Sequence, residues 1–378
     1  MKVSTLFCGH PKGYGVGYAC QSIVGGMASA GAEVDLHCAS ADKVMLKPYF
    51  RPLIPVWGQA IGYRIFKPSF IQLLLESRYC RQLNAGDIAY LWPGASMGVY
   101  RVAKEKGCVI VTENINTHTA TSKQILDREY ARLGLPPAHS VDAKMIADED
   151  AKLALADYVF SPSPEVSRSL REARVPEQKI IESSYGMDVG DIMSADAIPA
   201  RREAKSVPTA LFVGRIGIRK GVHLLLDYWV KAKVPGILKL VGNIEADARH
   251  LIEPYLRHPS IQHIPFSTSL KQLYQDADVF VFPSLEEGSP LVTYLALGAG
   301  LPTLVSPMGG GGVVEDGFNG WVKDPHDEEA WVEAIRLLFT NVELRHRYSE
   351  NAYAKASCYF WHDVGARRFQ QLATLAAR

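Results

Sequence analysis

The chain has 378 residues, a length that favours two domains over one. Its hydrophobic content of 47% and charged content of 21% are typical of a globular protein with large buried cores. The formal net charge of +1 at pH 7 gives no overall basicity, so composition offers no support for nucleic acid as a partner.

The cysteines indicate a reducing compartment. Six are scattered along the chain and no two form a CxxC pair, so we expect neither a disulfide framework nor a cysteine metal site. The first apolar run is too short for a signal peptide, and no run approaches 18 apolar residues. We therefore expect a cytoplasmic protein.

Short apolar runs that end at Gly, Pro, Ser or Asn predict the strands. They are residues 3–8, 33–38, 87–92, 108–112 and 157–163, then 209–214, 236–242, 276–284 and 301–306. Helix-length patterns lie between them, for example at 69–83, 122–134 and 220–232. Buried strands that alternate with helices imply parallel βαβ units, and two such series imply two doubly wound α/β domains.

The domain boundaries follow from a break in this periodicity. We expect a Rossmann-like domain over 1–190, a linker over 191–208, a second Rossmann-like domain over 209–355 and a terminal helical segment over 356–378. Ligands bind beyond the carboxyl ends of the strands in open parallel sheets. With two such sheets facing a central cleft, that cleft is the expected site.

The first strand is followed by Gly13, Gly15 and Gly17, which open a helix. Backbone N–H groups at such a turn can approach a phosphate. A purely structural turn is an equal alternative, because the spacing is GxGxG and not GxGxxG. No acidic residue ends the second strand, which argues against a nicotinamide dinucleotide.

The second half carries charged turns at its strand ends. Arg215 and Lys220 flank the turn after residues 209–214 and predict a diphosphate clamp, with solvated surface cations as the alternative. The strand ends at 240–243 and 262–266 could hold a nucleotide base, although connecting loops explain them nearly as well. Glu287 could accept hydrogen bonds from sugar hydroxyls or simply cap a helix.

The order and spacing of these segments over 209–335 resemble the donor domain of retaining GT-B glycosyltransferases of family 4 (glycosyl transferases group 1), in the bacterial polysaccharide and lipopolysaccharide branch. "TENINTHTATSKQILDREY" and "ADEDAKLALADYVFSPSPEVSRSL" resemble the acceptor domain less strongly. "YFWHDVGARRFQQL" is similar to the closing helix that returns to the first domain. The resemblance implies a GT-B fold and transfer of a sugar from a nucleotide-diphosphate sugar to a glycan, lipid-linked or small-molecule acceptor. It implies no metal and no cofactor.

The resemblance also implies roles for matching residues. Arg215 and Lys220 would hold the donor diphosphate, Glu287 would contact the donor sugar, and His118 would lie near that sugar. For His118 a structural hydrogen bond is the alternative, and Glu113 is a less favoured polar partner. The expected donor-binding positions are Gly15, Gly17, Gly214, Gly242, Asn243, Ile264, Gly288, Ser289, Pro290, Leu291 and Leu295, with the amides of Ser289 to Leu291 near the sugar and phosphate.

One position departs from the family pattern. A second glutamate normally follows the first by eight residues and binds the ribose, but this chain has Leu295 there, and Glu286 is on the wrong side of Glu287 to replace it. Another group holds the ribose, the donor is unusual, or catalysis is impaired. We favour the first explanation. The alternatives are a catalytically impaired homologue that binds a nucleotide sugar or glycan, or another GT-B enzyme such as an epimerase or phosphorylase.

Residues 43–81 combine cations with large apolar side chains. The cations are Lys43, Lys47, Arg51, Arg64, Lys67, Arg78 and Arg81, and the apolar residues include Phe50, Leu53, Ile54, Trp57, Phe66 and Phe70. This composition suits an anionic membrane on its inner face and a lipid-linked acceptor. An ordinary amphipathic helix pair with solvated cations is an equal alternative.

Overall fold

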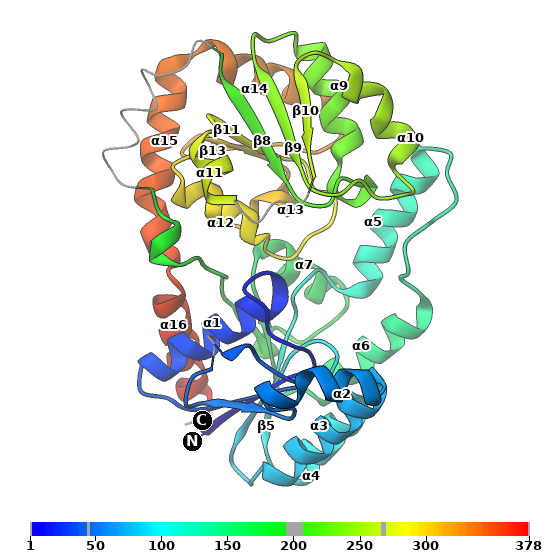
Figure 1. The fold of residues 1–378 in the computed structure, drawn as a ribbon, viewed down its shortest axis with the longest axis vertical. Coiled ribbons are helices and arrows are strands. Elements are labelled where there is room, and N and C mark those ends of the chain that lie inside the picture. Colours follow the sequence, from blue (N-terminus) through cyan, green and yellow to red (C-terminus); the bar gives the residue numbers. More distant parts are fainter. Residues whose placement is uncertain (1, 44–45, 194–206, 266–269, 377–378) are drawn as a thin grey trace. The chain divides into compact units, whose positions relative to one another are not determined.

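The computed structural model describes residues 2–43, 46–193, 207–265 and 270–376 (Figure 1). The chain forms two compact units. Unit 1 comprises Met1–Ala120, Asp142–Gly186 and Trp361–Arg378, and unit 2 comprises Thr121–Val141 and Met187–Phe360. Each unit is built on an open parallel sheet with helices between its strands, which confirms the two doubly wound domains.

The sheet of unit 1 has seven parallel strands in the order β3-β2-β1-β4-β5-β6-β7. They are β1 (Lys2–Phe7), β2 (Glu33–Cys38), β3 (Phe50–Pro52), β4 (Ile88–Leu91), β5 (Val109–Glu113), β6 (Tyr158–Ser161) and β7 (Ile180–Glu182). The central strand β4 is buried along its whole length, because helices cover both faces of the sheet.

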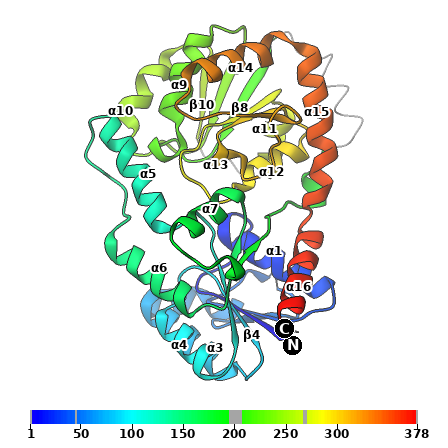
Figure 2. The same cartoon turned by 180° about the vertical axis from the view of Figure 1, so that it is seen from behind.

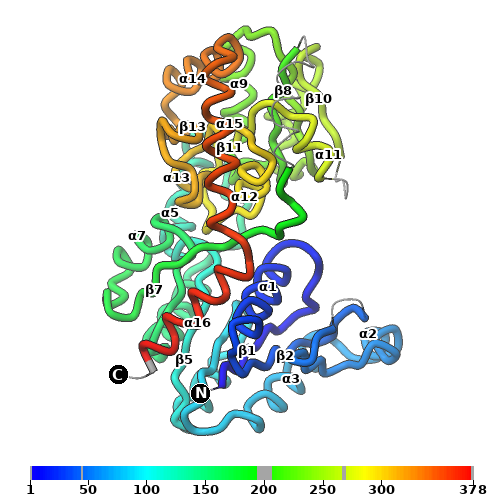
Figure 3. The backbone as a smooth tube through the Cα atoms, turned by 90° about the vertical axis from the view of Figure 1, so that its left-hand side faces the viewer, coloured from blue at the N-terminus to red at the C-terminus, as the bar shows by residue number. Residues whose placement is uncertain are grey.

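The helices of unit 1 are α1 (Gly15–Ser29), α2 (Gln59–Ile65), α3 (Pro68–Gln82), α4 (Met97–Glu105), α6 (Ala143–Leu155), α7 (Pro164–Glu172) and α16 (Trp361–Ala376). Crossovers between parallel strands are right-handed. Therefore α1, which leads from β1 to β2, lies on the opposite face from α4, which leads from β4 to β5. The first and last helices, α1 and α16, pack side by side (Figures 1 and 3).

The sheet of unit 2 has six parallel strands in the order β10-β9-β8-β11-β12-β13. They are β8 (Thr209–Val213), β9 (Ile237–Val241), β10 (Ile261–Ile264), β11 (Val279–Phe282), β12 (Thr303–Val305) and β13 (Gly320–Val322). The helices are α9 (Val222–Ala232), α10 (Arg249–Ile252), α11 (Leu270–Gln275), α12 (Leu291–Gly298), α13 (Pro307–Gly310), α14 (Glu328–Thr340) and α15 (Val342–Ala356). Helices α9 and α14 lie side by side (Figure 2). The rings of Trp229 and Phe339 pack edge to face, with their centres 5.0 Å apart.

Most predicted strands coincide with observed ones, but β3, β7 and β13 were missed. Each has three residues, one or more of which is charged, proline or glycine, so none forms an apolar run. The equally short β12 was predicted because its three residues lie within the longer run 301–306. No helix in the described ranges has the length and apolar character that a membrane span requires.

The units differ from the predicted boundaries in three places. Residues 187–190 cluster with unit 2, although the first domain was expected to extend to residue 190. Helix α5 (Thr119–Arg132) starts in unit 1, but residues 121–141 cluster with unit 2. The terminal segment joins unit 1 only from Trp361, whereas 356–360 stay with unit 2. These boundaries depend on contacts between residues distant in sequence, and the periodicity of apolar residues does not reveal such contacts. Most of the predicted linker, 194–206, lies outside the described residues.

Candidate functional site

All strands of unit 2 are parallel, so their carboxyl ends meet at one edge of the sheet. The loops that leave this edge after β8, β9 and β11 carry most of the donor-site residues predicted from the sequence. This edge is therefore the first candidate site.

The centre of this edge is an ion pair between two predicted site residues. Lys220 ends the short helix η5 (Ile218–Lys220) after β8, and Glu287 lies in the loop after β11. Lys220 Nζ contacts Glu287 Oε1, and only 12% and 16% of the two side chains are exposed. Burial lowers the pKa of the Lys220 ammonium, and the neighbouring cation Arg219 lowers it further, whereas the carboxylates of Glu286 and Glu245 act in the opposite direction.

A second ion pair, between residues that had no role predicted from the sequence, lies beside the first. Arg219 Nε lies 2.6 Å from Glu286 Oε2, and the Glu286 side chain is 1% exposed. Arg219 also lies 3.9 Å from the Glu287 carboxylate. Two adjacent cations thus meet two adjacent carboxylates, a pattern that could have been read from the sequence pairs 219–220 and 286–287.

Gly221 allows the turn that carries Lys220 and the loop after β11 to lie close together. Its φ of +65° is left-handed, and a Cβ there would lie 2.2 Å from the carbonyl oxygen of Pro283 in the loop after β11. A larger residue would be strained and would push the loops apart. The N–H of Leu285 also donates to the carbonyl of Arg219 at 2.9 Å. These backbone contacts therefore determine which residues of the two loops face each other.

The ends of β8, β9 and β10 also come together. Gly242 has a φ of +142°, and a Cβ there would lie 1.9 Å from the carbonyl oxygen of Gly214. The N–H of Gly242 donates to the carbonyl of Ile264 at 3.0 Å. Asn243 follows with an exposed side chain, and its carbonyl accepts from Ile216 at 2.9 Å. Four predicted donor-binding positions are thus neighbours.

Arg215 is held more loosely than Lys220. Its side chain is 81% exposed, and its Nη1 lies 3.5 Å from Glu245 Oε1. An ion pair this exposed adds little stability, so Arg215 is free to turn toward an anion. With Glu245 included, three cations face three carboxylates at this edge, whereas the sequence predicted a role for only two of the cations, Arg215 and Lys220.

The start of α12 corrects one expectation. Pro290 precedes the helix and has no amide hydrogen, so the expected donors at 289–291 reduce to Ser289 and Leu291. Gly288 precedes them in the same loop, and Ser289 Oγ lies 2.8 Å from the hydroxyl of Tyr294. Leu295 is half-buried, one helical turn after Leu291 on the same side of α12. The apolar side chain of Leu295 therefore occupies the position at which the family pattern has its second glutamate.

A further buried carboxylate in unit 2 was missed. Glu129 of α5 is 2.8 Å from His223 Nε2 and 2.7 Å from His326 Nε2, and its side chain is 3% exposed. Arg132 Nη2 contributes a third contact at 3.0 Å. Burial alone would raise the pKa of Glu129, but these hydrogen bonds outweigh burial and lower it. The partners lie far apart in sequence, so no local pattern signalled the cluster.

His118 lies in unit 1, and both of its ring nitrogens are engaged. Nδ1 accepts from the N–H of Ala120 at 3.3 Å, so the ring proton sits on Nε2, which is 3.1 Å from Asp150 Oδ1. The N–H of Thr119 donates to Glu149 at 2.7 Å. His118 and Glu149 thus cap the N-terminus of α5, which is the structural alternative named for His118. A role near the donor sugar stays a prediction.

The other predicted residues of unit 1 lie at the start of α1. Gly15 is its first residue and Gly17 lies in its first turn, after the N-cap residue Tyr14, whose side chain does not cap the helix. A phosphate contact by these glycines stays a prediction.

Glu113, at the end of β5, forms a fully buried ion pair with Arg368 of α16, at 2.7 Å. The hydroxyl of Tyr90 also donates to Glu113. Burial and Glu113 both raise the pKa of Tyr90, so that hydroxyl keeps its proton. Arg368 further contacts the hydroxyl of Ser183 and the carbonyl of Ser184, at 2.9 and 3.1 Å. These contacts give Glu113 a structural role.

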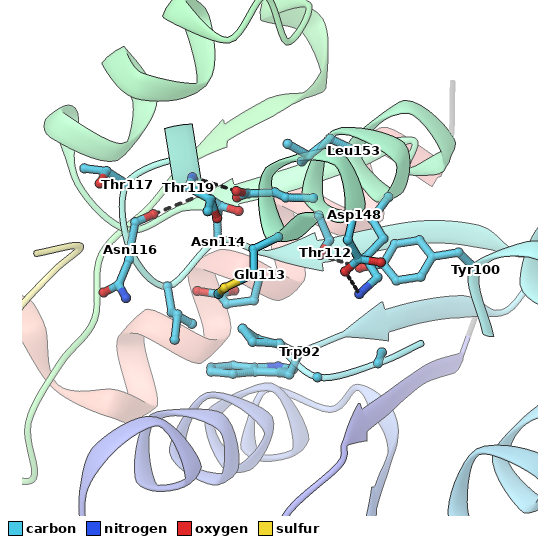
Figure 4. A pocket seen from close by; sticks show the side chains of 17 residues that line it. Trp92, Tyr100, Thr112, Glu113, Asn114, Asn116, Thr117, Thr119, Asp148 and Leu153 are labelled. Carbon is cyan, nitrogen blue, oxygen red and sulfur yellow. Dashed lines mark hydrogen bonds and ion pairs between the residues drawn. The ribbon is translucent and has the colours of Figure 1, made fainter. Parts of the chain in front are cut away.

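Unit 1 also contains a pocket of about 330 Å³ beyond the ends of β4 and β5 (Figure 4). Trp92 lies on one side of it, and Asp148 and Leu153 of α6 lie opposite. Lys152 Nζ lies 2.6 Å from Asp148 Oδ2, and Glu149 and Asn116 also line the wall. The wall thus carries two carboxylates from α6 against one cation.

No group of three or more His, Cys, Asp or Glu side chains in the described ranges is arranged to hold a metal ion.

Comparison with known proteins supports the family resemblance. Residues 195–355 match the family model described as glycosyl transferases group 1. The O-antigen chain mannosyltransferase C of Escherichia coli is 27% identical over 210 residues, which are 53% of this chain and 56% of that protein. The chain spans about half the length of the curated relatives it matches. These matches support a transferase enzyme.

Solved structures show the same fold over the whole chain. Sucrose-phosphate synthase from Thermosynechococcus elongatus has a TM-score of 0.75 at 19% identity, with 100% of this chain and 99% of that chain covered. Anabaena HepE in complex with UDP-glucose has a TM-score of 0.69 at 16% identity, with 99% and 100% covered. The predicted GT-B type of fold, with two Rossmann-like domains, is confirmed.

Proposed function

We propose that this chain is a retaining glycosyltransferase of family 4 that moves a sugar from a nucleotide-diphosphate sugar to an acceptor hydroxyl without a metal ion. The observation that carries the proposal is the Lys220–Glu287 pair at the carboxyl edge of the unit 2 sheet, within the segment that matches the family model. A relative of the same fold binds UDP-glucose, which supports a nucleotide sugar as the donor.

In the proposed reaction, the bond between the anomeric carbon and the diphosphate oxygen breaks, and the diphosphate leaves with the electron pair. The acceptor oxygen bonds to the anomeric carbon on the same face, and its proton passes to the departing diphosphate. Arg215 and Lys220 stabilise the charge that develops on the diphosphate. Glu287 accepts hydrogen bonds from the donor sugar, which orients the anomeric carbon.

Arg219 is a positioning residue in this proposal. Because it pairs with Glu286 and reaches toward Glu287, it holds the loop after β11 against the turn that carries Lys220. Lys220 is then shared between Glu287 and the donor diphosphate.

A thermal-shift panel of UDP-, GDP-, ADP- and TDP-sugars tests donor binding. Ligand at a hundred times its dissociation constant adds about 2.7 kcal/mol of stability, enough to move the Tm by several degrees. We expect one nucleotide class to stabilise the wild type and not Lys220→Met, and the same class to give a transfer product with retained configuration. A flat panel with folded protein would favour the impaired homologue, which none of the comparisons supports.

For the acceptor, we propose an uncharged sugar ring of a glycan, held in the pocket of unit 1. The pocket volume, about 330 Å³, is at the small end of ligand sites and suits one ring. Asn116 and Glu149 offer hydrogen-bonding groups for hydroxyls, whereas the carboxylates of Asp148 and Glu149 would repel a phosphate.

Saturation-transfer NMR with methyl hexosides and hexose 6-phosphates tests this acceptor class. We expect the neutral sugars to bind and the phosphates to bind about tenfold more weakly. Asp148→Asn should reduce that difference, and Glu172→Gln, an exposed change on α7, should not. Tighter binding of the phosphates would refute the neutral acceptor and leave the donor proposal intact.

We also propose a cytoplasmic location, peripheral on the inner face of the membrane. None of the six cysteines is in a disulfide, which fits a reducing compartment. The basic and apolar segment 43–81 supports the membrane part of the proposal.

A further inference from the structure

One face of unit 1 exposes an unusual number of large apolar side chains. Half of the exposed large apolar residues of the described chain lie between 56 and 74: Val56, Trp57, Ile61, Tyr63, Ile65, Phe66, Phe70, Leu73 and Leu74. We name these residues, with Arg64 and Lys67, the α2–α3 face. Trp57 is 84% exposed, and every residue from 63 to 70 is exposed. Isolated exposed apolar residues need no explanation, but a contiguous patch marks an interaction site.

The opposite side of the same helices is well packed. Ile71, Leu75 and Tyr79 of α3 are buried in the core of unit 1. Gln59 of α2 donates to the carbonyl of Ala41 at 2.8 Å. The exposed side is therefore the outer face of a folded element and not a sign of poor packing. Figure 3 shows α2 on the far side of unit 1 from α16.

The charges on this face have one sign. No Asp or Glu occurs between Asp42 and Glu76, whereas the same interval contains Lys43, Lys47, Arg51, Arg64 and Lys67. Arg64 and Lys67 are exposed within the apolar patch itself. A second copy of the chain would bring like charges together without carboxylates to pair them. A surface that is both apolar and negatively charged complements the face.

A bilayer that contains anionic lipids offers both properties over a broad area, so it complements this face in charge and in apolar character. We propose that the α2–α3 face docks on an anionic lipid bilayer, with Trp57, Ile65 and Phe66 in the interfacial region. Arg64 and Lys67 contact the lipid phosphates, and their methylene stems extend the apolar surface. This deepens the proposed peripheral location by naming the face and the lipid charge, and it depends on no catalytic assignment.

Hydrogen bonds connect the α2–α3 face to the carboxyl edge of the unit 1 sheet. The hydroxyl of Tyr63 lies 2.6 Å from Ser40 Oγ, and Ser40 Oγ lies 2.6 Å from His10 Nδ1. Ser40 follows β2 and His10 follows β1, so both lie where the strands end. The bilayer would therefore lie near the edge that also carries the pocket. A lipid-linked acceptor, which rests on the proposed function, would be presented there.

Vesicle co-sedimentation of the full chain tests the proposal. We expect binding to vesicles of phosphatidylglycerol mixed with phosphatidylcholine, weaker binding at high salt, and little binding to phosphatidylcholine alone. Each basic residue near an anionic surface is worth roughly fivefold in affinity, so Arg64→Gln with Lys67→Gln should weaken binding about 25-fold. Ile61→Ser with Ile65→Ser should weaken it by a similar factor. Phe318→Ser with Val342→Ser, which removes exposed apolar residues of unit 2, is the matched control and should have no effect.

Two outcomes would overturn the proposal. One is vesicle binding that neither pair of α2–α3 changes reduces, with the variants shown to be folded by their Tm. The other is no vesicle binding together with a dimer in sedimentation that Ile61→Ser with Ile65→Ser dissociates, because the face would then hold a second copy. Neither readout requires turnover, so a failure here leaves the proposed reaction untouched.

Discussion

Replacing Arg368 with methionine should destabilise unit 1 strongly, because it would leave the Glu113 carboxylate buried without its cation. Both side chains are 0% exposed, and Arg368 donates to Glu113 at 2.7 and 3.3 Å. It also donates to Ser183 at 2.9 Å, and its guanidinium lies 4.5 Å from the ring centre of Phe160. Breaking a buried ion pair by removing one partner costs about 3–5 kcal/mol.

This cost translates into a large shift of one thermal transition. A domain of this size loses roughly 2–4 °C of Tm per kcal/mol, so calorimetry should show the unit 1 transition lower by about 6–20 °C. Arg367→Met removes an exposed cation from the same helix and is the control. Adding Glu113→Gln to Arg368→Met should restore part of the stability, because the uncompensated charge is gone. A Tm for Arg368→Met within about 2 °C of the wild type would refute the reasoning.

Three further changes probe unit 2. Glu287→Gln should abolish transfer. It should also tighten UDP binding roughly tenfold in titration calorimetry, because Lys220 loses the carboxylate that competes with the diphosphate. Unchanged or weaker UDP binding would contradict the proposal that Glu287 and the diphosphate share Lys220. Gly221→Ala should lower the Tm and weaken nucleotide binding through left-handed strain of about 1–3 kcal/mol and a clash with the loop after β11, whereas Gly190→Ala, with open space around it, should do neither. Glu129 has a lowered pKa when folded, so its stabilisation is present above the ordinary carboxyl pKa and is lost as pH falls. The stability difference between wild type and Glu129→Gln in urea should therefore shrink from about pH 5 to pH 2, and a difference independent of pH would contradict the cluster.

The sequence alone determined most of the secondary structure and the doubly wound architecture of the two domains. Buried strands such as 209–213 read as short apolar runs because both faces of a parallel sheet are covered, and the alternation with helices required two doubly wound domains. The charged turns at 215–220 and 286–287 were also visible, because parallel strands place functional groups directly after their carboxyl ends. The amide expected at Pro290 was an avoidable error, since proline has no N–H.

Only the tertiary structure decided which of these groups meet. The pairing of Lys220 with Glu287 and the burial of Glu286 depend on how the loops after β8 and β11 pack, and their residues are separated by more than 60 positions. Likewise the structural role of Glu113 depends on its ion pair with Arg368, which lies in the last helix of the chain. The local pattern of apolar residues predicts which positions of a single helix or strand are buried. Ion pairs and unit boundaries depend on contacts between elements distant in sequence, and these contacts exist only once the chain has folded.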